Sequence, residues 1–298
     1  MKLKRSGRLV DMTRYLLKHP HELISLSFFS ERYQSAKSSI SEDLDIVKES
    51  FESQKAGLLL TVPGAAGGVK YIPAANMDEA RETVRELGTQ LKKSDRWLPG
   101  GYLYMTDILG SPRYVNEIGR LFASAFTERQ VDVVMTMETK GIPLAYATAS
   151  HLGVPVVIVR RAGRVTEGST VSINYVSGST RRIQSMALAR RSLQAGSNVL
   201  IIDDFMKAGG TIRGMINLLE EFDANLAGVG VFVEAKEVSR RLVDDYLSLL
   251  RFAEFDEATQ SVQIEEGSFF HNEALPDPFS AKEGNSHDSE NNKGVDLQ

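Results

Sequence analysis

The chain has 298 residues, of which 42% are hydrophobic and 25% charged, a globular composition long enough for two domains. It contains no cysteine, which excludes disulfides, cysteine nucleophiles and thiolate metal sites, and none of its five histidines has metal-ligand spacing. No apolar run approaches the roughly 18–20 residues of a membrane span. We therefore expect a cytoplasmic protein with no metal site of its own.

The net charge of -4 is unevenly distributed along the chain. Residues 1–40 carry eight lysines or arginines and three acids, a net +5, so the remaining residues carry -9. A basic end on an acidic protein favours a local nucleic-acid surface.

Three helices are predicted in the basic N-terminal part. Apolar residues about seven apart predict the first within SGRLVDMTRYLLKHP, with Ser6 as N-cap and Pro20 after its end. A shorter element follows in LISLSFFSERYQ, where Ser25 or Ser27 can act as N-cap. The third is indicated by an apolar stripe with spacings of four, three and four: Ile40, Leu44, Val47 and Phe51.

The first turn of the third helix is small, polar and basic, so it can enter a DNA major groove and approach phosphate with its positive end. Residues 57–73 then predict two strands around a glycine-rich turn, which gives residues 1–74 a winged-helix arrangement. The candidate DNA contacts are Lys2, Lys4, Arg5, Arg8, Lys37, Ser38, Ser39, Ser41 and Lys70. The alternative is a small helical dimerisation domain with an added hairpin.

Residues 75–275 predict a second, α/β domain. A polar linker helix is expected at about 76–94, capped by Asn76, and the domain boundary falls between about 73 and 98. Continuous apolar strands then alternate with amphipathic helices, which predicts a mostly parallel sheet with helices on both faces. The predicted strands are YLYM, VDVVMTM, VPVVIVR, SNVLIID and LAGVGVFVE. Residues 161–185 read as an inserted hairpin that can fold over a ligand, and residues 276–298 as a disordered acidic tail.

The segment VLIIDDFMKAGGT (199–211) leads from a buried strand into a loop and a helix. Gly209 and Gly210 allow backbone N–H groups to converge on an anion, beside the hydroxyl of Thr211 and the positive helix end. Asp203 and Asp204 would repel phosphate but suit the two hydroxyls of a ribose, or a metal ion. A ribose phosphate satisfies both halves of the segment. In the alternative reading, the two aspartates only cap the next element.

Two further loops leave the carboxyl ends of predicted strands, where such sheets bind ligands: ETKG (138–141) and RRAGR (160–164). Lys140 and Gly141, after Thr139, can hold a more highly charged anion such as pyrophosphate. Three other residues are pocket candidates: Tyr102, Arg160 and Phe205. Each can equally be an ordinary surface or anchoring residue. Lys207 and Ala208 complete the loop that we expect to bind the ribose phosphate.

The segment VLIIDDFMKAGGT resembles the phosphoribosyl pyrophosphate (PRPP) motif of type I phosphoribosyltransferases, and VMTMETKGIPLAYATA resembles their pyrophosphate loop. Over residues 1–270 the chain resembles purine operon repressors of the phosphoribosyltransferase type, a winged helix fused to such a domain. The resemblance implies a homodimer that binds double-stranded DNA in control regions of purine genes and is released by PRPP. It also implies guanosine tetraphosphate as a ligand of the same pocket in some members.

Lys207 favours sensing over catalysis. Many purine phosphoribosyltransferases have an acid at this position, whereas a lysine is poorly suited to proton transfer and well placed to attract another phosphate. We expect no catalytic residue and no required cofactor, with the need for Mg²⁺ beside PRPP left open. The alternatives are an active purine phosphoribosyltransferase with an N-terminal dimerisation domain and, less favoured, an RNA-binding attenuator. We hypothesise that the effector orders residues 161–185 and shifts a dimer arrangement.

Overall fold

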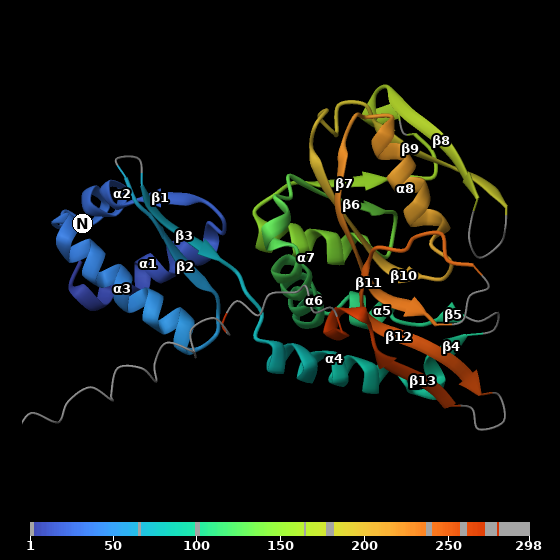
Figure 1. Cartoon of the computed structure of the whole chain (residues 1–298), viewed down its shortest axis with the longest axis horizontal. Helices are drawn as coiled ribbons and strands as arrows, with labels where there is room; N and C mark the ends of the chain where they lie inside the picture. The colour runs from blue at the N-terminus through green and yellow to red at the C-terminus, as the bar shows by residue number, and fades with distance from the viewer. Residues whose placement is uncertain are drawn as a thin grey trace, which may run out of the picture.

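The computed structural model describes residues 3–64, 67–98, 102–163, 165–176, 182–236, 240–256, 261–271 and 279. A smaller N-terminal unit lies beside a larger α/β unit (Figure 1), and separate clusters of buried apolar side chains fill them. Within the described ranges no helix combines the length and apolarity needed to cross a bilayer. The tail expected at 276–298 lies outside the described residues, apart from Phe279.

The N-terminal unit consists of three helices and a small antiparallel sheet of order β1-β3-β2, which confirms the predicted helices and hairpin. The apolar stripe of the third helix is buried against the other two helices and the sheet, as expected. The structure adds a short strand that pairs with the hairpin. The elements are α1 (Arg5–Lys18), β1 (Leu23–Ser25), α2 (Leu26–Tyr33), α3 (Lys37–Ser53), β2 (Leu58–Val62) and β3 (Gly68–Ile72).

Of the two helix-start predictions in the N-terminal unit, one is correct and the other is wrong. Ser25 caps α2, and its hydroxyl accepts a hydrogen bond from the N–H of Phe28 at 3.1 Å. Ser6 does not cap α1, because the helix already begins at Arg5 and Ser6 lies within its first turn. No side chain caps α1, and Arg5 and Arg8 of this helix pair instead with Asp43 on α3.

The helix expected as a polar linker is α4 (Met77–Leu91), and Asn76 caps it by accepting the N–H of Asp78 at 3.0 Å. This helix belongs to the core of the larger unit. Its buried residues are spaced four, three and four, a stripe that its many charged residues obscured: Ala80, Val84, Leu87 and Leu91.

The larger unit is built on a six-stranded sheet of order β13-β12-β11-β10-β6-β7, parallel except for the edge pair β12–β13. Its strands are β6 (Val133–Met137), β7 (Val156–Val159), β10 (Asn198–Met206), β11 (Asn225–Ala235), β12 (Leu247–Asp256) and β13 (Ser261–Glu266). The α/β class is therefore confirmed. β12 and β13 were not predicted, and YLYM is not part of this sheet. That segment forms β5 (Tyr102–Leu103), which pairs with β4 (Trp97–Leu98) in a separate hairpin.

Helices cover both faces of the sheet (Figure 1). Because side chains alternate along a strand, Leu200 and Ile202 of β10 belong to the cluster on the side of α4, α6 and α7, whereas Val199 and Ile201 belong to the cluster on the side of α8. The remaining helices are α5 (Thr106–Leu109), α6 (Pro112–Ala125), α7 (Ile142–Leu152) and α8 (Gly210–Glu220). Short 3₁₀ helices lie at Ser94–Arg96, Thr127–Arg129, Val165–Glu167 and Ser268–His271.

A hairpin is present, but it spans β8 (Thr170–Val176) and β9 (Ile183–Ala189), so it begins and ends later than the expected residues 161–185. It packs on α8, where Tyr175 and Met186 are buried and lie so close to Gly214 that a Cβ atom there would approach them to 3.0 and 2.5 Å. Both strands of the hairpin thus contribute to the core, as far as Tyr175 beside the tip, and residues 177–181 at the tip lie outside the described residues.

Candidate functional site

The strand order changes direction between β6 and β10. From β6 the chain adds β7 on one side, and β10 is then added on the other side of β6. Ligands of open α/β sheets bind at such a switch point, beyond the carboxyl ends of the strands. The structure places the segment Thr139–Gly141 after β6 and the aspartate pair near the end of β10, so both predicted loops meet there. Gly141 is buried against Thr136 and Asp203, which brings the two loops into direct contact.

Asp203 and Asp204 are held in an environment that disfavours their negative charge. Asp203 is only 7% exposed, and burial together with the neighbouring charge of Asp204 raises its pKa well above the ordinary value. Burial also raises the pKa of Asp204, while the ammonium of Lys140 lowers it. The N–H of Asp204 donates to Oδ1 of Asp203 at 3.0 Å. Hydroxyl donors from a ligand would stabilise these carboxylates, which fits a sugar diol.

The loop after β10 has the form of an anion site. Gly209 has φ +83°, the left-handed conformation expected of a glycine there, and it is the N-cap residue of α8. Gly210 and Thr211 begin the helix, so their N–H groups and the positive helix end lie at the loop. Lys207 is exposed at the outer part of the loop, and Ala208 is half-buried.

The remaining pocket candidates lie on β10, on β5 and directly after β7. Phe205 is partly buried and packs against the core on the α6 and α7 side, as a loop anchor does. Tyr102 lies in β5 opposite Leu98. The Arg160 guanidinium pairs with Glu138 at 3.1 Å and with Glu167 at 2.7 Å. Its contact with an anionic ligand stays a prediction, in which the ligand would share the guanidinium with these two carboxylates.

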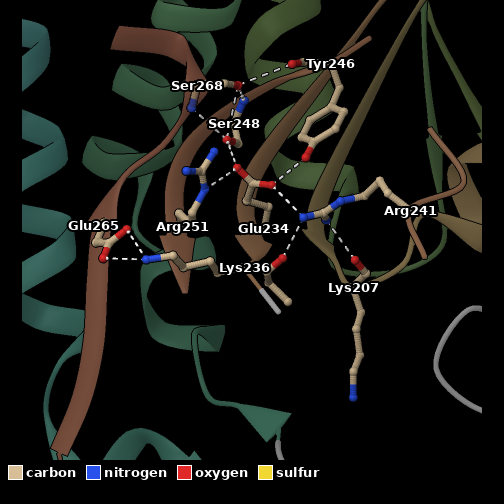
Figure 2. A network of polar contacts seen from close by, with 10 residues as sticks. Lys207, Glu234, Lys236, Arg241, Tyr246, Ser248, Arg251, Glu265 and Ser268 are labelled. Atoms are coloured by element: carbon tan, nitrogen blue, oxygen red, sulfur yellow. Dashed lines mark hydrogen bonds and ion pairs between the residues drawn. The ribbon is translucent and has the colours of Figure 1, made fainter. Parts of the chain in front are cut away.

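The sequence did not indicate the residues that hold the backbone of the loop after β10. Figure 2 shows Arg241 reaching from the segment before β12 to the backbone of Lys207 and to the buried carboxylate of Glu234 on β11. Arg241 is 34 residues from Lys207 in the sequence. No local pattern signals a contact between positions so far apart.

In the N-terminal unit, the first turn of α3 is available to a nucleic acid. Lys37, Ser38 and Ser41 are exposed and Ser39 is half-buried. The N-cap residue Ala36 has no side-chain oxygen, so the N–H groups of the first turn are left for a phosphate.

The other predicted DNA contacts differ in exposure. Lys4 is exposed, Lys70 on β3 is half-buried, and Lys2 lies outside the described residues. Arg5 and Arg8 both pair with Asp43, at 2.9 and 2.7 Å. The Arg8 side chain is 14% exposed and that of Asp43 only 1%, so Arg8 connects α1 to α3 rather than standing free on the surface.

Comparisons with known proteins match both units of the chain to described families. Residues 4–73 match the family model of the bacterial purine repressor N-terminal region, and residues 105–266 match that of the phosphoribosyl transferase domain. The chain is 66% identical over 269 residues to the purine biosynthesis transcriptional repressor PurR of Bacillus subtilis (strain 168), covering 90% of this chain and 94% of that protein. It is 48% identical over 269 residues to the purine biosynthesis transcriptional activator PurR of Lactococcus lactis subsp. lactis (strain IL1403), covering 90% and 99%.

A solved structure shares the fold of the larger unit. The adenine phosphoribosyltransferase of Thermoanaerobacter pseudethanolicus ATCC 33223 superposes with a TM-score of 0.50 at 22% identity, covering 56% of this chain and 99% of that one. This likeness shows a type I phosphoribosyltransferase fold behind the winged helix.

Proposed function

The chain belongs to the family of bacterial purine repressors, as its sequence predicted, and from that premise we propose that PRPP is the effector that releases it from DNA. The protein is a DNA-binding transcriptional regulator of purine biosynthesis, and its second domain has the phosphoribosyltransferase fold. The effector, its site and its consequence are the parts that we propose.

The proposal rests on one observation: two carboxylates near the end of β10, Asp203 buried and Asp204 half-buried, are followed directly by the anion loop (residues 207–211), beside Lys140 at the switch point. In our proposal the ribose hydroxyls of PRPP bind Asp203 and Asp204, and its 5-phosphate binds the N–H groups of residues 208–211. The pyrophosphate binds the loop of Lys140 and Gly141. Each group of the ligand then meets protein groups of complementary charge or hydrogen-bonding capacity.

We propose that this pocket senses PRPP without catalysing transfer. The Lys207 side chain is exposed and extends away from the Arg241 network (Figure 2), so it can add positive charge beside the loop. A lysine is poorly suited to proton transfer on a purine base and well suited to attract a phosphate. Incubation with PRPP and xanthine, guanine or adenine is expected to give no nucleotide. Nucleotide formation at enzyme-like rates would contradict sensing and favour a transferase.

For the DNA-bound state we propose a homodimer that places the first turn of α3 in the major groove and the β2–β3 wing beside the backbone. Guanosine tetraphosphate, which the family resemblance implies for some members, also combines a ribose with several phosphates. It would therefore compete with PRPP for the same loops.

Calorimetric titration tests the effector site directly. PRPP is expected to bind with one site per chain, and Asp203→Asn is expected to weaken binding at least about tenfold, because an amide replaces a charged acceptor of a hydroxyl. Titrations with and without Mg²⁺ decide whether the cation is needed. Wild-type protein that fails to bind PRPP under both conditions would refute the proposed effector.

A further inference from the structure

Three consecutive residues between β11 and β12 contact three consecutive residues of the anion loop. The Arg241 guanidinium donates through Nη1 to the carbonyl oxygen of Lys207 at 2.9 Å, and the Leu242 N–H donates to the carbonyl oxygen of Ala208 at 2.9 Å. Buried Val243 lies against Gly209, whose missing Cβ would come 3.2 Å from its Cγ2 atom. We call residues 241–243 the back clamp.

The back clamp determines which way the loop amides face. In a trans peptide the C=O and N–H groups point in opposite directions. The carbonyl of Lys207 shares its peptide plane with the N–H of Ala208, and the carbonyl of Ala208 shares its plane with the N–H of Gly209. With both carbonyls held by Arg241 and Leu242, these two N–H groups point away from the clamp. Anion loops need this orientation, in which amides face the ligand and carbonyls face away.

Arg241 is itself fixed by a buried acid. Its Nη2 atom lies 3.1 Å from the Glu234 carboxylate and donates to the carbonyl oxygen of Ala235 at 2.8 Å, and its guanidinium lies 5.5 Å from the centre of the Tyr246 ring (Figure 2). Glu234 is 0% exposed. Burial alone would raise its pKa, but hydrogen bonds from Tyr246, Ser248 and Arg251 outweigh burial and hold the pKa below its ordinary value. The carboxylate is therefore a charged, fixed anchor for Arg241.

We infer that Arg241 is a positioning residue for the effector phosphate, because it presets the amides of Ala208 and Gly209 to face the ligand before the ligand binds. The inference rests on the proposed function, since it assumes that this loop binds the phosphate of PRPP. Preset amides raise affinity because the ligand does not have to order them. Arg241 thus acts on the ligand only through the loop backbone.

The Glu234 network supplies a matched control. Arg251 on β12 pairs with the same carboxylate at 3.0 Å, and within the described part of the chain it makes no hydrogen bond to the anion loop. Arg241→Met and Arg251→Met each remove one cation from Glu234. Only Arg241→Met also removes the hydrogen bond to the carbonyl oxygen of Lys207. Arg241→Lys keeps the positive charge, but its donors all lie on one nitrogen, without the planar fork that reaches Lys207, Ala235 and Glu234 together.

The experiment is calorimetric titration of PRPP into wild type, Arg241→Met, Arg251→Met and Arg241→Lys, each checked for folding by thermal unfolding. We expect Kd to rise about tenfold for Arg241→Met, by an intermediate factor for Arg241→Lys, and less than about twofold for Arg251→Met. Amide resonances of Ala208 and Gly209 in the ligand-free protein should shift in Arg241→Met and stay in place in Arg251→Met. If Arg241→Met does not fold, the positioning role is tested by comparing the PRPP Kd of Arg241→Lys with that of Arg251→Met. A larger Kd in Arg241→Lys supports the role, and equal Kd values overturn it.

Equal losses in the Arg241 and Arg251 variants, or unchanged loop amides in Arg241→Met, would overturn the positioning role and leave the proposed function intact. Wild-type protein that does not bind PRPP would overturn the proposed function, and this inference with it. Full affinity in a folded Arg241→Met variant would overturn this inference alone.

Discussion

Gly141 packs so closely on Asp203 that a Cβ atom on the glycine would lie 3.1 Å from the Oδ1 atom of the aspartate. The same Cβ would lie 2.3 Å from Oγ1 of Thr136, a buried hydroxyl without a hydrogen-bond partner among the described residues. The loops proposed to bind ribose and pyrophosphate therefore meet at Gly141, which has no side chain. Their spacing, and with it the size of ligand that can bridge them, depends on this glycine.

Gly141→Ala is expected to separate the two loops and weaken PRPP binding at least about tenfold, since Asp203 and Thr136 have to move. DNA binding without effector should be unchanged, because the N-terminal unit is untouched. Calorimetry with PRPP and anisotropy with labelled DNA measure the two effects. Gly88→Ala on α4 is the matched control, since its Cβ would meet only ordinary contacts at 3.4 and 3.8 Å. Equal PRPP affinity in Gly141→Ala and wild type would show that the loops need not touch.

Asp203→Asn is expected to stabilise the protein while it removes the effector response. Between the ordinary aspartate pKa of 3.8 and the raised pKa of Asp203, the folded protein keeps a proton that the unfolded chain has lost. The free energy of unfolding therefore falls as pH rises through that window. An asparagine has no charge to bury, and its side-chain oxygen can still accept a hydrogen bond from the N–H of Asp204. The variant should exceed wild type in stability at pH 7, by about 0.5–2 kcal/mol, and the difference should shrink as pH falls towards 3.8.

Asp107→Asn, in the same domain, is expected to change the free energy of unfolding in the opposite direction. Hydrogen bonds from Arg96 at 2.7 Å lower the pKa of Asp107, so its contribution to stability is present above pH 3.8 and is lost as pH falls through the lowered pKa. This variant should be less stable than wild type at pH 7. Chemical denaturation across pH gives both curves. A destabilised Asp203→Asn at pH 7 would show that the aspartate is charged and satisfied in the ligand-free protein.

Lys37→Ala and Arg8→Ala are expected to separate DNA contact from domain stability. Lys37 is exposed at the first residue of α3, so its loss should weaken DNA binding and reduce the salt dependence by about one phosphate contact. Loss of Arg8 leaves the buried Asp43 with one arginine fewer, which should destabilise the N-terminal unit by about 2 kcal/mol.

Binding isotherms over a range of salt concentrations, together with thermal unfolding, distinguish the two variants. A fully stable Arg8→Ala with a smaller salt slope would show that Arg8 contacts DNA and that its ion pair with Asp43 matters little. An unchanged salt slope in Lys37→Ala would remove that residue from the DNA backbone.

The parts of the fold that depend on local pattern could be predicted from the sequence. The stripe from Ile40 to Phe51 shows its helical spacing directly, and Gly209 indicates a left-handed turn whatever surrounds it. The unpredicted strand β12 (Leu247–Asp256) mixes charged with apolar residues, and it is defined by pairing with β11 and β13. Its pairing partners, rather than its own pattern, make it a strand.

The candidate site likewise has residues that could be predicted from a local sequence pattern and contacts that could not. Asp203 and Asp204 could be identified because the segment that contains them carries its chemistry within a few residues. The ion pairs of Arg160, the closeness of Gly141 to Asp203 and the support of Lys207 by Arg241 all join residues that are distant in sequence. A single sequence shows charge and size but not which distant carboxylate neutralises which arginine, so these contacts required the structure.

Control of DNA binding by PRPP is tested most directly by binding to a purine-gene control fragment at fixed salt, titrated with PRPP, for wild type and Asp203→Asn. We expect wild type to leave the DNA as PRPP rises, whereas the variant binds DNA equally well without PRPP and stays bound when PRPP is added. Because coupling between two ligands is reciprocal, DNA should also weaken PRPP binding to wild type by the same factor. Tight binding by wild type that is indifferent to PRPP, or equal PRPP affinity with and without DNA, would contradict the claim that this pocket controls DNA binding.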